Sequence, residues 1–184
     1  MLHTPLSRRH CLQLLGSAAA MGLQRPSTAA ATGAQGMGQL AAWPAGQATP
    51  ALQAQTLAGA PRSLNDYAGQ PLIVNFWATY CAPCRLEIPQ FNTLLERFRL
   101  QGLQVLAVNH GEMPARVEKF LHTLPFAGDV LLDRSQTQLK AWGGFALPSS
   151  FVVDRQGRVR WWHMGEIDWL HPDQQAKLRQ TLGI

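Results

Sequence analysis

Short apolar runs alternate with segments of helical spacing through the middle of the chain. Leu72 to Trp77 is a β-rich apolar run, which is typical of a central strand buried on both faces. From Pro83 to about Leu100 the apolar residues instead recur every three or four positions, which predicts a helix with one buried face. Leu103 to Val108 is the next apolar run. This order predicts a βαβ unit, with parallel strands and a right-handed crossover.

The same alternation continues to the C-terminus. The expected elements are a helix over Pro114–Leu124, a strand over Val130–Leu132, a helix over Ser135–Trp142 with Ser135 as its N-cap, strands over Ser149–Val153 and Arg158–His163, and a helix over Pro172–Leu182. The turn Asp154-Arg155-Gln156-Gly157 predicts that the last two strands form a hairpin. Ala51 to Leu57 alternates weakly and predicts a first strand. The whole pattern predicts an α/β fold: a central mixed sheet flanked by helices, with an N-terminal strand or hairpin extension.

The N-terminal residues have the pattern of an export signal. Ser7-Arg8-Arg9 precedes a modestly apolar run from Cys11 to Leu23, and Ala29-Ala30-Ala31 is a suitable cleavage site. The arginine pair and the weakly apolar core resemble a twin-arginine signal. A helix of 13 residues spans only about 20 Å, which is too short for a stable membrane span. We therefore expect residues 1–31 to be a cleaved secretory signal and the protein to be periplasmic.

The composition divides the rest of the chain into a linker and one domain. Residues 32–50 are rich in Ala, Gly, Gln and Pro and are predicted to be a flexible linker, which leaves residues 51–184 as the folded domain. Loss of the arginines of the signal lowers the formal net charge from +5 to +2, so no basic surface for nucleic acid is expected. Loss of Cys11 leaves two cysteines, Cys81 and Cys84.

These two cysteines form a C-x-x-C motif where the predicted helix follows the buried strand. A helix N-terminus offers unpaired N–H groups and partial positive charge, and both stabilise a thiolate. Cys81, at the end of the loop, is expected to be the more exposed sulfur and a nucleophile with a pKa below about 8.5. Cys84, one turn further into the helix, is expected to attack the mixed disulfide that Cys81 forms.

A cysteine pair can also bind a metal ion or form a structural disulfide. Tetrahedral zinc needs four ligands, and the sequence holds no second C-x-x-C and no paired histidines. His110, His122 and the pair His163-Met164 are available as further ligands, so a copper site stays open as an alternative. A structural disulfide that closes so short a loop removes little unfolded-state entropy. Electron transfer by the cysteine pair, with no metal and no other cofactor, is the favoured interpretation.

The sequence resembles the thioredoxin superfamily, and within it the periplasmic thiol–disulfide oxidoreductases similar to TlpA, ResA and CcmG. The matching residues are Asn75–Pro89, Leu147–Asp154 and Gly157–Val159. The resemblance covers about Leu52 to Leu182 and implies a thioredoxin-like fold. It also implies that Cys81 is the attacking nucleophile, that Cys84 is the resolving thiol, and that Pro148 is a cis-proline beside the active site.

The resemblance also draws attention to residues near the motif. Similar proteins carry an acid at the position of Glu87, where a partly buried carboxylate can take the proton of Cys84 as a general base. Tyr80 stands where many relatives have Trp, and is expected to shield the thiolate. Arg85 is close to the cysteines, and either favours the thiolate or is a surface residue of the helix.

The direction of electron flow depends on the reduction potential, which spans about −270 to −120 mV among C-x-x-C proteins. Proline at the third position of the motif resembles reductants, so we expect a monomeric disulfide reductase. Its expected clients are secreted proteins with disulfides, apocytochrome c among them, and a membrane thiol carrier is expected to re-reduce it. A disulfide oxidase or isomerase and a copper-binding assembly factor are the alternatives.

Overall fold

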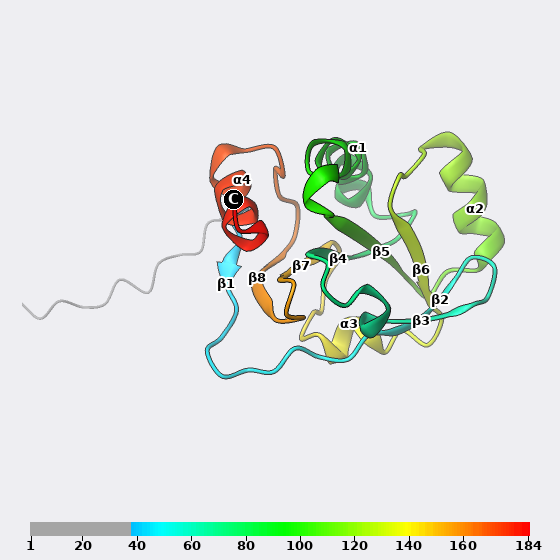
Figure 1. Ribbon diagram of the computed structural model, residues 1–184. Helices are drawn as coiled ribbons and strands as arrows, with labels where there is room; N and C mark the ends of the chain where they lie inside the picture. Colours follow the sequence, from blue (N-terminus) through cyan, green and yellow to red (C-terminus); the bar gives the residue numbers. More distant parts are fainter. Residues whose placement is uncertain (1–37) are drawn as a thin grey trace, which may run out of the picture. The chain divides into compact units, whose positions relative to one another are not determined.

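The computed structural model describes residues 38–184, and a mixed sheet of eight strands lies at the centre of this part of the chain (Figure 1). The strands are β1 (Ala41–Ala42), β2 (Gln53–Thr56), β3 (Pro61–Ser63), β4 (Leu72–Trp77), β5 (Gln104–His110), β6 (Asp129–Asp133), β7 (Ser149–Val153) and β8 (Val159–Met164). Their order across the sheet is β1-β8-β7-β4-β5-β6-β2-β3. The predicted α/β fold with an N-terminal hairpin extension is confirmed, because β2 and β3 pair antiparallel at one edge.

The parallel part of the sheet is the predicted βαβ unit. Helix α1 (Ala82–Arg97) connects β4 to β5, and α2 (Pro114–Thr123) connects β5 to β6. The three strands run parallel, whereas β7 pairs antiparallel with both β4 and β8. Helix α1 is followed by a short 3-10 turn, Arg99–Gln101, which ends at Gly102 in the left-handed region (φ 72°). The carboxyl end of β4 is therefore the point from which α1 starts.

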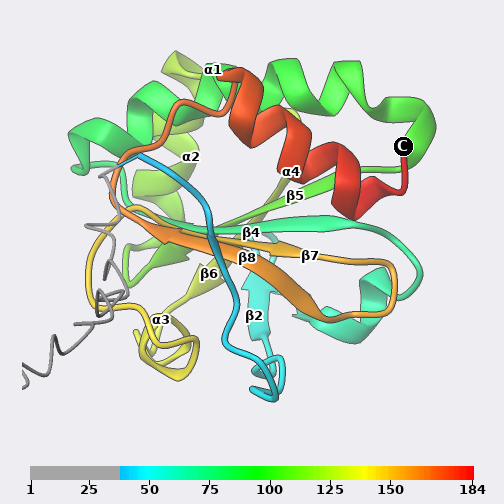
Figure 2. The same cartoon turned by 90° about the vertical axis from the view of Figure 1, so that its left-hand side faces the viewer.

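Helices cover both faces of the sheet. Because side chains alternate along β4, this strand contributes to the core on each of the two faces. Figure 2 shows α1, α2 and α4 (Pro172–Leu182) on one face and the short α3 (Gln138–Ala141) on the other. Ile73 packs with apolar residues of α1 and α4, whereas Val74 and Phe76 pack on the opposite face with Leu139 and Trp142. Since side chains alternate along a strand, Asn75 and Trp77 lie on the same face as Ile73, beneath α1.

The short helix predicted over Ser135–Trp142 begins later than expected. Helix α3 starts at Gln138, and its N-cap residue is Thr137 rather than Ser135. The carboxylate of Asp133 accepts the backbone N–H groups of Thr137 (3.3 Å) and Gln138 (2.8 Å). Ser135 instead donates its hydroxyl to Asp133 (2.8 Å). The longer carboxylate side chain at the end of β6 therefore caps this helix, and the prediction of Ser135 as the N-cap is wrong.

The prediction of a flexible linker is wrong for residues 38–50, because this segment packs on the fold. β1 pairs antiparallel with β8 at the edge of the sheet. Leu40 is buried, and its backbone is held by the side chains of Gln174 (3.1 Å) and Lys177 (2.6 Å) of α4. Trp43 packs edge-on against Phe151 and Trp162. The apolar contacts of Leu40 and Trp43 thus hold this segment on the fold, although its composition is typical of linkers. The signal predicted for residues 1–31 and residues 32–37 of the linker lie outside the described residues.

Within residues 38–184, no helix has both the length and the apolar character that a membrane crossing requires.

Candidate active site

The two cysteines of the motif form a disulfide directly after β4, at the N-terminus of α1. Their Cα atoms are 5.3 Å apart. Cys81 is the N-cap residue of α1, and its sulfur accepts the backbone N–H of Cys84 at 3.3 Å. Pro83 occupies the first turn, where its missing N–H leaves no partner unsatisfied, and no acid stands in that turn. The helix terminus therefore presents donors and partial positive charge to Cys81, which favours a thiolate there.

The two cysteines differ in their access to solvent. Cys81 retains 8 % of its surface exposure and Cys84 only 1 %. Both pack in an apolar cluster with Trp77, Ile88 and Leu147. Cys81 is therefore the more accessible of the two cysteines for a substrate sulfur that arrives from solvent.

Glu87 lies one helical turn after Cys84 and is completely buried. Its Oε2 accepts a hydrogen bond from Nδ2 of Asn75 (3.2 Å), and its Oε1 accepts the backbone N–H of Ile167 (3.1 Å). Burial raises the pKa of Glu87 to about 8, although these hydrogen bonds favour the ionised form. The carboxyl group is thus mostly protonated at neutral pH and able to exchange a proton near it.

Asn75 and Ser150 complete the surroundings of Glu87. Nδ2 of Asn75 also donates to Oγ of Ser150 (2.9 Å), and both side chains are buried. Neither residue was among the sequence-based candidates. Asn75 carried a usable signal, because a polar residue inside an otherwise apolar buried strand needs a hydrogen-bond partner. Ser150 carried none, since Ser is common in strands of every kind.

A second buried carboxylate, Glu112, lies on the other side of the motif and was also missed. It accepts hydrogen bonds from the N–H (2.7 Å) and the hydroxyl (2.6 Å) of Thr79 and from Asn109 (2.7 Å). Arg116 pairs with it at 2.8 Å. Burial by itself would raise the pKa of Glu112, but these hydrogen bonds and the Arg116 charge outweigh it and lower the pKa. Glu112 is thus a permanent anion that fixes the loop before Cys81.

Pro148 lies in the loop that leads into β7, and the Leu147–Pro148 peptide bond is cis. Ser149 is the register partner of Phe76, so Pro148 comes beside the end of β4, where the motif begins. The carbonyl of Pro148 accepts the N–H of Gly165 (2.8 Å). The structure thus places Pro148 beside the carboxyl end of β4, after which the disulfide follows.

Tyr80 and Arg85 flank the motif on its exposed side. Tyr80 is 63 % exposed, so most of its side chain faces solvent, and the expectation that it shields the thiolate stays a prediction. The guanidinium of Arg85 lies 5.8 Å from the centre of the Phe120 ring. Arg85 therefore packs on α2, and this contact fixes its charge near the start of α1.

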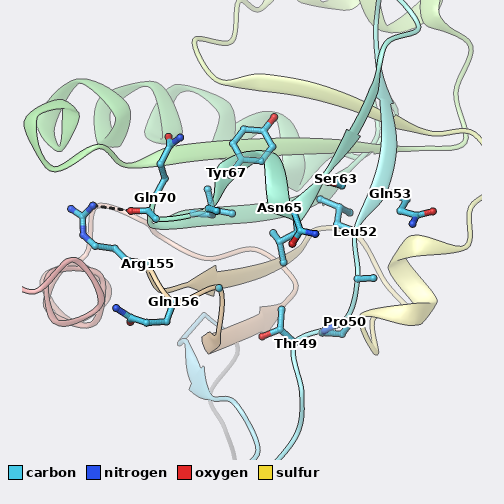
Figure 3. Close-up of a pocket in the computed structure, with 16 residues that line it drawn as sticks. Thr49, Pro50, Leu52, Gln53, Ser63, Asn65, Tyr67, Gln70, Arg155 and Gln156 are labelled. Carbon is cyan, nitrogen blue, oxygen red and sulfur yellow. Dashed lines mark hydrogen bonds between the residues drawn. The ribbon is translucent and has the colours of Figure 1, made fainter.

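Within residues 38–184, no group of three or more His, Cys, Asp or Glu side chains is arranged to hold a metal ion. A cavity of about 450 Å³ lies at the opposite end of β4, lined by residues that include Tyr67, Gln70 and Arg155 (Figure 3). Arg155 is its one charged lining residue and already donates to the carbonyl of Gly69 at 3.2 Å. We assign no role in the chemistry to this cavity.

Comparison with known proteins agrees with this geometry. Residues 45–162 match the model of the AhpC/TSA family. The chain is 36 % identical over 115 residues to the thiol-disulfide oxidoreductase ResA of Geobacillus thermodenitrificans, a match covering 62 % of this chain and 66 % of that protein. It is 33 % identical over 96 residues to ResA of Bacillus subtilis, covering 52 % and 54 %. The matches thus span just under two thirds of the first relative and about half of the second.

The fold has close counterparts among solved structures. A putative thiol:disulfide interchange protein DsbE from Chlorobium tepidum superimposes with a TM-score of 0.65 at 28 % identity, covering 78 % of this chain and 96 % of that one. A thioredoxin family protein from the same organism gives a TM-score of 0.64 at 26 % identity, covering 74 % and 97 %. The chain therefore belongs to the AhpC/TSA family, within the thioredoxin superfamily that its sequence resembles.

Proposed function

We propose that the protein is a thiol–disulfide oxidoreductase that acts as a disulfide reductase on exported proteins. The observation that carries the proposal is the Cys81–Cys84 disulfide at the N-terminus of α1, with the more accessible sulfur at the N-cap. The buried acid Glu87, one turn beyond Cys84, supports it. The names of the ResA relatives and of the DsbE neighbour indicate the same chemistry in those proteins.

The proposed reaction begins with the reduced protein. The Cys81 thiolate attacks one sulfur of a client disulfide, so that a mixed disulfide forms and the other client sulfur leaves as a thiolate. Glu87, as the carboxylate, then takes the proton of the Cys84 thiol. The resulting thiolate attacks Sγ of Cys81 and displaces the second client sulfur. The client disulfide gains two electrons and becomes a dithiol, while the protein is oxidised to the Cys81–Cys84 disulfide.

The direction of this exchange is part of the proposal. The C-A-P-C motif resembles reductants, because proline stands at its third position. In such proteins, a less stable thiolate favours the disulfide and makes the dithiol a stronger reductant. We propose a periplasmic location, secreted clients such as apocytochrome c, and a membrane thiol carrier that returns electrons to the protein.

The activity is tested by whether the protein catalyses the reduction of insulin disulfides by a small dithiol, monitored as turbidity. Equilibration with glutathione buffers measures the reduction potential. We expect turnover that requires both cysteines. The reduction potentials of such proteins extend over about 150 mV, and we expect the potential of this protein to be nearer about −270 mV than about −120 mV. A potential at the oxidising end would favour an oxidase instead. No turnover by the wild type, together with no client trapped on Cys81 of the Cys84→Ala variant in the native host, would contradict the proposal.

A further inference from the structure

The carboxyl group of Glu87 has neighbours of different chemical kinds. The side chain of buried Trp169 can only donate a hydrogen bond, and it lowers the pKa of Glu87. The backbone N–H of Ile167, on Oε1, can only donate a hydrogen bond. The side-chain amide of Asn75, on Oε2, carries two N–H donors and a carbonyl acceptor in one group that can rotate. The two oxygens of the carboxyl group are therefore not equivalent.

This difference decides which oxygen carries the proton when Glu87 is neutral. A protonated carboxyl group has one O–H donor, which needs an acceptor when it is buried. On Oε1 that O–H would face the N–H of Ile167, and two donors would oppose each other. The proton therefore belongs on Oε2, the oxygen that faces Asn75.

The partner of Asn75 on its other side is equally adaptable. Ser150 is the cross-strand neighbour of Asn75, and its hydroxyl accepts from Nδ2 at 2.9 Å. A hydroxyl both donates and accepts. A half-turn of the Asn75 amide places Oδ1 where Nδ2 was, so that Oδ1 accepts from the O–H of Glu87 and from the O–H of Ser150 together. The O–H of Glu87 and the O–H of Ser150 then both have an acceptor when Glu87 is protonated.

We propose that Asn75 and Ser150 are positioning residues for proton transfer by Glu87: Asn75 donates to the carboxylate and turns its amide to accept from Oε2 once that oxygen is protonated, while Ser150 reverses its hydroxyl in step. This inference rests on the proposed function, in which Glu87 takes a proton. The proton leaves the sulfur of Cys84 and ends on Oε2, and no other bond at Glu87 changes. A cation in place of Asn75 would hold Glu87 ionised, and an apolar residue would hold it protonated.

The other titratable groups around Glu87 come from three elements. Cys84 lies on its own helix. Glu166, in the loop after β8, raises the pKa of Glu87 by its charge. His163 of β8 is the register partner of Ser150, and burial lowers its pKa, so the ring is neutral where Glu87 titrates. The buried face of α4 carries uncharged residues, and β4 and β7 contribute the uncharged Asn75 and Ser150.

The test uses the oxidised protein, because the disulfide removes both thiols from the titration. The Glu87 carboxyl carbon and the Asn75 side-chain amide are followed by NMR from pH 5 to 10. We expect both signals to change with one common midpoint near pH 8. Asn75 signals that stay constant while Glu87 titrates would overturn the proposal, and this measurement needs no variant.

A matched pair of variants gives the second arm. Asn75→Leu removes the donor to the carboxylate. Because a hydrogen bond to a charged group is stronger than one to a neutral group, this variant should raise the titration midpoint of Glu87 by about one pH unit. Asn109→Leu removes another buried asparagine, which donates to Glu112, and should leave that midpoint unchanged. A Glu87 midpoint unmoved in Asn75→Leu would contradict the proposal. No client is present, so failure of the reductase assay and failure of this test are separate results.

Discussion

Glu112 accepts hydrogen bonds from both the backbone N–H and the hydroxyl of Thr79, the residue two positions before Cys81. The two oxygens of one buried carboxylate thus hold both polar groups of a loop residue. Glu112 thus holds the loop before the motif, and Glu87 follows the motif in α1, and the pKa values of these two buried acids move in opposite directions. Environments that separate two acids in this way assign them different tasks. Glu112 holds the loop as a permanent anion, whereas Glu87 is able to exchange a proton.

Glu112→Gln should destabilise the protein by about 1–3 kcal/mol, because an amide cannot accept all three hydrogen bonds and loses the Arg116 charge pair. Urea unfolding at pH 7 measures the difference. Glu118→Gln, an exposed residue of α2, the helix that follows Glu112, is the control and should change stability by less than about 0.5 kcal/mol. Equal stability of Glu112→Gln and the wild type would mean that the carboxylate does not hold the loop.

The raised pKa of Glu87 predicts a specific dependence of stability on pH. The folded protein binds this proton more tightly than the unfolded chain, since the pKa rises from 4.5 to about 8 on folding. The stabilisation is therefore complete below about pH 4.5 and is lost as pH rises towards 8, at up to about 1.4 kcal/mol per pH unit.

Unfolding of the oxidised protein between pH 5 and 8 measures this slope. Glu87→Gln cannot ionise, so the stability of the wild type relative to this variant should fall steadily across the range. Parallel curves for the two proteins would show that Glu87 titrates normally. The lowered pKa of Glu112 does not interfere, because its contribution is present at higher pH and is lost only in more acidic solution.

Glu87→Gln should also slow resolution of the mixed disulfide, by about 10²-fold, because general base catalysis typically contributes at least this much. Single-turnover kinetics separate this step from the first attack by Cys81, which should be unchanged. Glu96→Gln, an exposed acid of the same helix, is the matched control. Resolution at the wild-type rate, with the wild-type pH profile, would remove Glu87 from the mechanism.

Leu40→Ala should destabilise the protein by about 2–5 kcal/mol, the usual cost of truncating a buried leucine. The prediction follows from the packing of the N-terminal segment on β8 and α4. Thermal or urea unfolding measures it. Leu100→Ala, at a residue 86 % exposed, should change stability by less than about 0.5 kcal/mol. If both variants unfold like the wild type, the segment contributes nothing to the folded domain.

The order of strands and helices could be read from the chain because it depends on local periodicity. The run Leu72–Trp77 became β4, and the three- and four-residue spacing after Pro83 became α1. The start of α1 at the C-x-x-C motif followed from the same pattern, so the position of Cys81 at a helix N-terminus was predictable. The N-cap of α3 was not, because Asp133 reaches it from the preceding strand.

Only the tertiary structure decided which groups surround the sulfurs. The partners of Glu87 are Asn75, 12 positions before it, and Ile167, 80 positions after it, and no local pattern links them. Leu40 and Gln174 are 134 positions apart. Periodicity reports which face of an element is apolar, whereas a hydrogen bond between distant elements depends on how the sheet orders its strands. The sequence by itself thus determined the elements and pointed to Cys81, Cys84 and Glu87 as candidates. The packing of those elements determined the complete burial of Glu87, its proton affinity and its partners.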